Sequence, residues 1–142
     1  MIPLTLVALL LVPAAGSTSV DRDLSAALAF VNARCPAAYR EVSKTMWIRG
    51  TRLNALYGNC RAGDGHDQHI WFFVAGRFVG MDATHSSPQI FGLWGTGDTL
   101  AFMYVLYRPH DSNCCATGGG KVVRFRWTGR RVDPLDAVPP RR

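Results

Sequence analysis

Charged side chains are scarce in this chain. Asp, Glu, Lys and Arg make up 18% of its 142 residues, whereas hydrophobic residues make up 48% and aromatic residues 11%. So little charge on a chain so rich in apolar residues excludes a disordered tail protein and a coiled coil. The length leaves no room for a second globular domain of ordinary size, and we predict one folded domain over residues 17–142.

Lysine is nearly absent, because fourteen of the sixteen basic residues are arginine. Together with ten acidic residues they give a formal net charge of +6 at pH 7. A basic chain can bind nucleic acid, but here the basic residues are scattered along the sequence, and export from the cytoplasm would remove that partner. We therefore expect no nucleic-acid partner.

Charge is missing altogether from the first fifteen residues, an apolar run that leads into the small residues Gly16 and Ser17. This outline is typical of a secretory signal peptide that is processed near Gly16. The run is shorter than the ~20 apolar residues that cross a bilayer, so we expect no transmembrane helix. We predict that residues 1–16 are a signal peptide and that the protein is secreted or lies in the cell envelope. The alternative is a buried N-terminal segment.

The sequence holds four cysteines, Cys35, Cys60, Cys114 and Cys115, but no C-x-x-C pair. Without such a pair, or a Cys/His series at ligand spacing, we predict no metal and no cofactor. An even number of cysteines in a small exported domain indicates disulfides. Of the three pairings we favour the crossed one, in which Cys35 and Cys60 bond to Cys114 and Cys115, because a bond between adjacent cysteines would close a strained ring.

One amphipathic helix is predicted at the start of the domain. Over residues 21–33, Leu24, Leu28 and Val31 fall on one helical face, and an aspartate caps the start. Pro36 prevents a clean continuation, and a second short helical turn is expected over residues 37–44.

From Met46 onward, short apolar or aromatic runs alternate with glycine, which is typical of strands. Two hairpins with two-residue turns are predicted, over residues 69–81 and 121–132. Further strands are expected over residues 52–57, 89–94 and 99–107, and the last is so continuously apolar that it should be central.

These elements predict the α+β fold class. We expect a hairpin-rich antiparallel β-sheet of five or six strands, with the N-terminal helix packed on it and disulfides stapling the domain. The alternative is the same strands curled into a small sandwich.

The residues that could carry catalysis lack a recognised spacing. His66, Asp67 and His85 offer two imidazoles and a carboxylate, but His66 lies in a Gly/Asp-rich turn and no H-E-x-x-H helix is present. Ser86 lacks the glycine-flanked elbow of a serine nucleophile, and the glycines at 118–120 lead into a strand rather than a helix N-terminus. We expect no enzyme. The alternative is a small secreted hydrolase whose site is assembled from His66, Asp67 and His85.

Alternation in the second hairpin points to a basic face. Because Val123 and Phe125 fall on one side of the strand, Arg124 and Arg126 must project to the other, where Arg130 or Arg131 on the returning strand can join them. One interpretation is a solvated face; the other is a candidate anion-binding patch of Arg124, Arg126 and Arg130.

Several segments occur in an order that is similar to a known family. They are Tyr-Gly-Asn-Cys at 57–60, Gly-Arg-Phe-Val-Gly at 76–80, Tyr-Arg-Pro at 107–109, Asn-Cys-Cys-Ala-Thr-Gly-Gly at 113–119, Val-Arg-Phe-Arg-Trp-Thr-Gly at 123–129 and Leu-Asp-Ala-Val-Pro-Pro at 135–140. With these gaps the chain resembles the LppP/LprE family of actinobacterial envelope lipoproteins. The resemblance implies export and an envelope location, and it assigns no catalytic role to any residue here.

One position departs from the lipoprotein pattern. A lipoprotein carries a cysteine at its processed N-terminus, and here Ser17 follows Gly16. Serine cannot form the thioether to the lipid, so we expect a secreted protein without an acyl chain. We predict a secreted, non-catalytic module of the cell envelope that binds an anionic envelope component or a protein partner.

Overall fold

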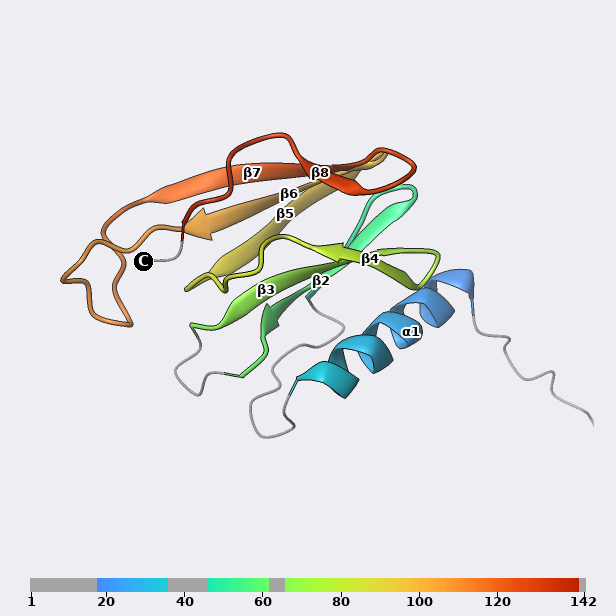
Figure 1. Cartoon of the computed structure of the whole chain (residues 1–142), viewed down its shortest axis with the longest axis horizontal. Helices are drawn as coiled ribbons and strands as arrows, with labels where there is room; N and C mark the ends of the chain where they lie inside the picture. Colours follow the sequence, from blue (N-terminus) through green and yellow to red (C-terminus); the bar gives the residue numbers. More distant parts are fainter. Residues whose placement is uncertain (1–17, 36–45, 62–65, 141–142) are drawn as a thin grey trace, which may run out of the picture.

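The computed structural model describes residues 18–35, 46–61 and 66–140, so the predicted signal peptide and the second helical turn lie outside the described residues. One helix and two four-stranded antiparallel sheets form three layers (Figure 1). In chain order they are α1 (Ser19–Arg34), β1 (Trp47–Arg49), β2 (Leu53–Asn59), β3 (Gln68–Val74), β4 (Arg77–Met81), β5 (Ile90–Thr96), β6 (Thr99–Val105), β7 (Gly120–Trp127) and β8 (Val132–Pro134).

The first sheet has the order β1-β2-β3-β4 and the second β5-β6-β7-β8. The prediction of one sheet of five or six strands is therefore wrong in its count, while the α+β class and the helix on a sheet are confirmed. The sandwich alternative describes the arrangement of the strands. Alternate residues of β3 explain the three layers: Trp71 and Phe73 pack under α1, and Ile70 and Phe72 pack against the second sheet. A strand that is apolar on both faces must be covered on both.

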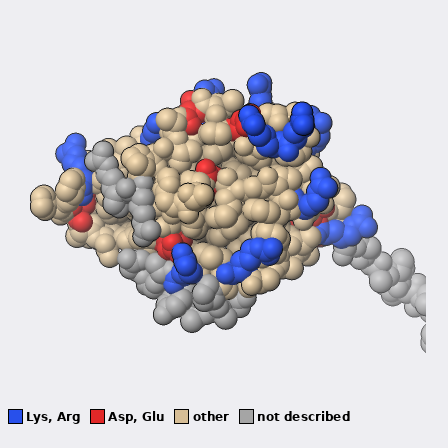
Figure 2. Space-filling model, viewed as in Figure 1, with Lys and Arg blue, Asp and Glu red and all other residues tan. Residues whose placement is uncertain are grey.

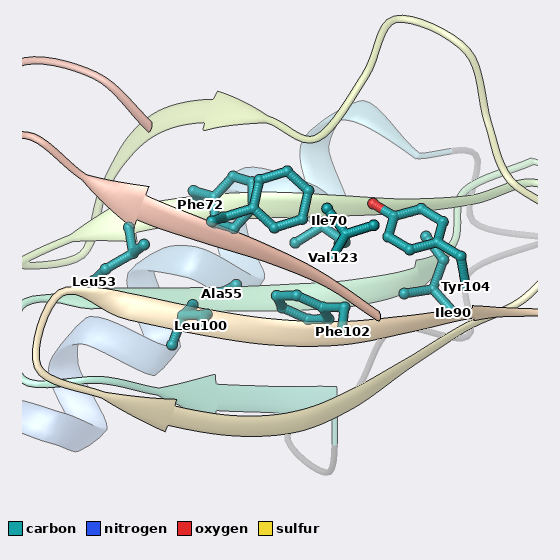
Figure 3. Close-up of a cluster of buried hydrophobic side chains, with 10 residues drawn as sticks. Leu53, Ala55, Ile70, Phe72, Ile90, Leu100, Phe102, Tyr104 and Val123 are labelled. Atoms are coloured by element: carbon teal, nitrogen blue, oxygen red, sulfur yellow. The ribbon is translucent and has the colours of Figure 1, made fainter. Parts of the chain in front are cut away.

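The core between the sheets combines aromatic and aliphatic side chains (Figure 3). Phe72 of the first sheet meets Phe102 and Phe125 of the second, with ring centroids 6.3 and 5.0 Å away. The predicted alternation of β7 is confirmed, because Val123 and Phe125 are buried there and Arg124 is exposed. The strand predicted to be central, β6, does lie inside its sheet.

The helix begins two residues before the predicted start. Thr18 is its N-cap, and the side chains and backbone of Thr18 and Asp21 form a reciprocal capping box. The predicted apolar face is confirmed, because Val31 is fully buried and Leu24 and Leu28 pack against the cluster under the helix.

The two predicted hairpins differ in their turns. The first has the expected two-residue turn at Ala75 and Gly76, whose φ angles of 48° and 72° suit the right-handed twist of the paired strands. In the second, Trp127 pairs with Val132, so the turn spans residues 128–131. Arg130 and Arg131 therefore lie in a four-residue turn and not on the returning strand, which corrects the prediction.

The crossed disulfide pairing is also wrong. Cys35 bonds to Cys60, and Cys114 bonds to Cys115; all four cysteines are used. Cys35 is the C-cap of α1 and Cys60 follows β2, so packing the helix on the first sheet brings their Cα atoms to 4.8 Å. The adjacent pair lies in the β6–β7 loop of the second sheet. The pairing follows from the layer in which each cysteine lies, and the expected strain of a disulfide between adjacent residues does not prevent the Cys114–Cys115 bond.

The sandwich is closed at one end. There Arg52, in the β1–β2 turn, forms a two-pronged ion pair with Asp98 in the β5–β6 turn. The backbones are also close, since a Cβ placed on Gly95 would lie 2.0 Å from the carbonyl oxygen of Arg49. Because β6 starts at this end and runs away from it, the residues after Val105 lie at the other, open end (Figure 1).

The two disulfides should contribute very differently to stability. The Cys35–Cys60 bond spans 25 residues, so the double variant Cys35→Ser/Cys60→Ser should lose about 3.5 kcal/mol of unfolding free energy by the chain-entropy estimate. The variant Cys114→Ser/Cys115→Ser removes a bond that constrains almost no unfolded chain and should lose about 1 kcal/mol or less. Urea unfolding of both variants measures this. Equal losses would contradict the assignment.

Candidate functional site

A pocket of about 310 Å³ lies at the open end of the sandwich. We call it the end pocket. It lies against the strand end of β6, the start of β7 and two loops, and most of its lining is apolar. The lining residues are Ser87, Pro88, Tyr104, Val105, Leu106, Tyr107, Arg108, Gly118, Lys121, Pro139 and Pro140.

The chain folds into this wall because the apolar run of β6 continues beyond the strand. The backbone N–H of Leu106 donates to the carbonyl of Gly119 at 2.9 Å, and that of Gly118 donates to the carbonyl of Leu106 at 2.8 Å. A Cβ on Gly118 would lie 2.3 Å from that carbonyl oxygen, so this close approach requires glycine. Gly118 and Gly119 thus bring the β6–β7 loop back to the pocket.

The loop itself is held by one carboxylate. Asp111 accepts the backbone N–H of Arg108 and both the N–H and the hydroxyl of Thr117, each at 2.7 Å. These hydrogen bonds lower the pKa of Asp111. The Cys114–Cys115 disulfide lies within this loop, so both hydrogen bonds to Asp111 and a covalent bond constrain the segment beside the pocket.

Tyr104 forms part of the pocket wall and reaches across the sandwich. Its hydroxyl donates to Oδ2 of Asp82 at 2.7 Å, and Oδ1 of Asp82 accepts the backbone N–H of Ile70 at 3.0 Å. Asp82 follows β4 and its side chain is fully buried. Burial raises the pKa of Asp82 in spite of these hydrogen bonds, and burial together with the Asp82 charge raises the pKa of Tyr104. The pair ties the end of the first sheet to β6 of the second.

His69 lies between two carboxylates behind this wall. Its Nδ1 is 4.0 Å from Asp82 and its Nε2 is 4.0 Å from Asp67. Burial lowers the pKa of His69, although Asp82 and Asp67 oppose that shift. Burial alone would raise the pKa of Asp67, but the nearby Ser86 hydroxyl, His69 and Arg61 outweigh it, and the pKa is below its ordinary value. His69 is therefore neutral at pH 7 beside an ionised Asp67.

The three residues of the predicted hydrolase site take separate roles. Nε2 of His66 lies 3.2 Å from the hydroxyl of Tyr107, and Nε2 of His85 donates to the carbonyl of Pro139 at 3.0 Å. Asp67 is buried beside His69. The two imidazoles thus contact two lining residues of the end pocket. The structure brings them to the same end of the molecule, but these contacts do not form the nucleophile, base and orienting group of a hydrolase.

Two of the three predicted anion-binding arginines interact with aspartates. Two of the side-chain nitrogens of Arg124, Nε and Nη2, donate to Asp136 at 2.9 and 3.0 Å, and these bonds lower the pKa of Asp136 to about 2. The charge of Arg126 acts on Asp98, which is already paired with Arg52. Arg130 lies in the β7–β8 turn. The anion-binding role of Arg124, Arg126 and Arg130 stays a prediction, with Arg124 already paired within the protein.

Residues 49–130, more than half of the chain, match the family model described as LppP/LprE lipoprotein. The chain belongs to the LppP/LprE lipoprotein family. No curated protein and no solved structure matches it. The LppP/LprE match spans β2 to β7 and therefore most of the end pocket, and the resemblance carried by the segments from 57 to 129 is confirmed.

Two further observations concern the described part of this LppP/LprE member. Within residues 18–35, 46–61 and 66–140, no helix has the length and apolar character to cross a membrane. In the same residues, no three His, Cys, Asp or Glu side chains are grouped as metal ligands.

Lys121 lines the end pocket but was not among the predicted site residues, although the sequence contains a signal for it. Lys121 has the same parity on β7 as Val123 and Phe125, whose side chains face the core. A lysine at the end of an otherwise apolar inward stripe indicates that the stripe opens to solvent there. Tyr104 and Asp82 gave no such signal, because their contact joins positions 22 residues apart in different sheets.

The buried neutral His69 predicts a loss of stability in mild acid. Between pH 6.5 and the lower pKa of folded His69, the unfolded chain binds a proton that the folded protein does not, so the unfolding free energy falls as the pH falls. The slope for one proton is at most about 1.4 kcal/mol per pH unit.

Urea unfolding from pH 7 to pH 5 should show this slope in the wild type. The variant His69→Gln should show a shallower one, whatever its absolute stability. Equal slopes in the two proteins would show that His69 is not the titrating group.

Proposed function

We propose that this protein is a non-catalytic binding module of the cell envelope, acting outside the cytoplasm, and that it binds a small amphipathic anion in the end pocket. The family match and the Cys35–Cys60 disulfide support the location, because structural disulfides persist in oxidising compartments. The proposed binding role rests on the lining of the end pocket, which is largely apolar and includes Lys121 and Arg108.

The composition of the pocket favours a ligand with an apolar body. Val105, Leu106 and three prolines supply apolar lining, and a volume of about 310 Å³ lies at the lower end of the ~300–1,000 Å³ of small-molecule sites. Removing an alkyl chain from water against such a surface contributes about 0.8 kcal/mol per buried methylene. A fully hydrated sugar would gain little here.

The charges of the pocket favour an anionic head group. Arg52, Arg124 and Arg131 each pair with an aspartate. Among the described residues, by contrast, Lys121 and Arg108 form no such ion pair, although the charge of Lys121 acts on Asp136 and that of Arg108 on Asp111. Both are cations beside an apolar wall, where a carboxylate or phosphate of the ligand can accept their hydrogen bonds.

The pocket is also built to hold its shape. Its wall at Tyr104 is fixed by Asp82, its wall at Tyr107 contacts His66, and its wall at Pro139 is held by His85. The hydroxyl of Tyr107 in addition donates to the carbonyl of Asn113 at 2.9 Å. A preformed site loses less conformational entropy on binding than a mobile one, which favours a binding role for these residues.

Calorimetric titration with decanoate tests the proposal. Decanoate should bind, and decyltrimethylammonium, which has the same chain and the opposite charge, should bind at least about tenfold more weakly. The variant Lys121→Met should lower the affinity for decanoate by about tenfold or more, because it removes one charge-assisted hydrogen bond while keeping the apolar length.

The matched control is Arg126→Met. It removes one positive charge from the same strand, β7, but from the opposite face, and should leave the affinity unchanged. No binding of decanoate, or equal losses in the two variants, would contradict the proposed site.

A further inference from the structure

The two sheets of the sandwich differ in what covers their outer faces. On the first sheet, Trp71 and Phe73 are buried under α1. On the second sheet, large apolar side chains remain exposed. They are Phe91, Leu93 and Trp94 of β5, Val122 of β7 and Leu135 just after β8.

Three of the outward side chains form a row across the second sheet. Phe91 pairs with Met103, and Met103 pairs with Val122, so the row crosses β5, β6 and β7. Phe91 is 46% exposed and Val122 is 45% exposed. We call Phe91, Met103 and Val122 the outer row. Trp94, 44% exposed, lies on the next outward position of β5, opposite Ala101.

The outer row belongs to a surface that becomes basic along the strands. Arg126 lies on the same face of β7, four residues beyond Val122, which is about 13 Å along a strand. Arg130 and Arg131 follow in the β7–β8 turn, where Arg131 is paired with Asp133. Figure 2 shows Lys and Arg side chains gathered over the end of the molecule where Figure 1 places that turn. The face thus combines exposed aromatic and aliphatic groups with positive charge.

We propose that the outer face of the second sheet docks on an anionic lipid surface. The outer row and Trp94 lie at the level of the head groups, where aromatic side chains are favoured, and Arg126 and Arg130 interact with lipid phosphates. A second copy of this chain is a poorer occupant, because the arginines of two such faces would repel each other. This site is separate from the end pocket and rests only on the proposed envelope location.

The proposal is tested with the full chain and vesicles of phosphatidylglycerol or phosphatidylcholine. The protein should co-sediment with phosphatidylglycerol vesicles, more weakly as salt is raised, and at least about tenfold more weakly with phosphatidylcholine. The emission of Trp94 should shift to shorter wavelength on binding. The variant Trp94→Phe should still bind but lose that shift, which identifies the face in contact.

The variant Phe91→Ser/Val122→Ser should lower partitioning into phosphatidylglycerol vesicles about tenfold or more, because it removes two apolar groups from the contact. The matched control Met81→Ser removes a side chain of similar exposure, 41%, from the first sheet and should partition like the wild type. All variants carry the same residues 1–16, so any binding by that apolar run is common to them. Thermal unfolding checks that each variant is folded.

Three outcomes would overturn the proposal. The Trp94 emission could stay unchanged with phosphatidylglycerol, or the Phe91→Ser/Val122→Ser variant could partition like the wild type. Alternatively, light scattering could show a wild-type dimer that this variant dissociates, without any binding of vesicles, which would make the face an interface between copies. If Lys121→Met loses decanoate binding but binds vesicles normally, the outer face of the second sheet acts independently of the end pocket.

Discussion

The hydrogen bond from Tyr104 to Asp82 is the contact on which the functional end of this molecule depends. Asp82 accepts one donor from its own sheet, the N–H of Ile70, and one from the opposite sheet, the hydroxyl of Tyr104. The Asp82 carboxylate is fully buried, so removing one of these donors would lower the unfolding free energy of the protein by roughly 1–3 kcal/mol or more. The two sheets are therefore held in one relative position there. That position leaves the end pocket open, while the Arg52–Asp98 ion pair closes the opposite end.

Local features of the fold could be predicted from the sequence, because they depend on neighbours along the chain. The alternation of Val123 and Phe125 and the turn at Ala75 and Gly76 are set by period and by backbone preference. The number of sheets could not be predicted in this way. From Ile70 to Val74, β3 is apolar at every position, and periodicity does not tell whether a helix or a second sheet covers each face. The disulfide pairing was wrong for the same reason, since it depends on which layer holds Cys35.

The end pocket was not predicted from the sequence. His66 and His85 were selected for their chemistry, and the structure uses them to contact Tyr107 and Pro139 in the pocket wall. Their partners are 41 and 54 residues away, so no spacing rule could reveal them. Lys121 was recognisable in principle, as a charged residue in an inward stripe. Arg124 and Arg126 are exposed on β7 as predicted, but Arg124 is paired with Asp136, which the strand pattern alone does not show.

The proposed function requires that ligands bind in the end pocket of this LppP/LprE family member. Its most direct test is the map of backbone amide chemical shifts during a titration with decanoate. Binding in the end pocket should concentrate the changes at residues 105–108 and 118–121, which line or adjoin the pocket. Amides of the outer row, including Phe91 and Val122, should move little. Changes confined to that outer face, or none at saturating decanoate, would show that the end pocket is not the ligand site.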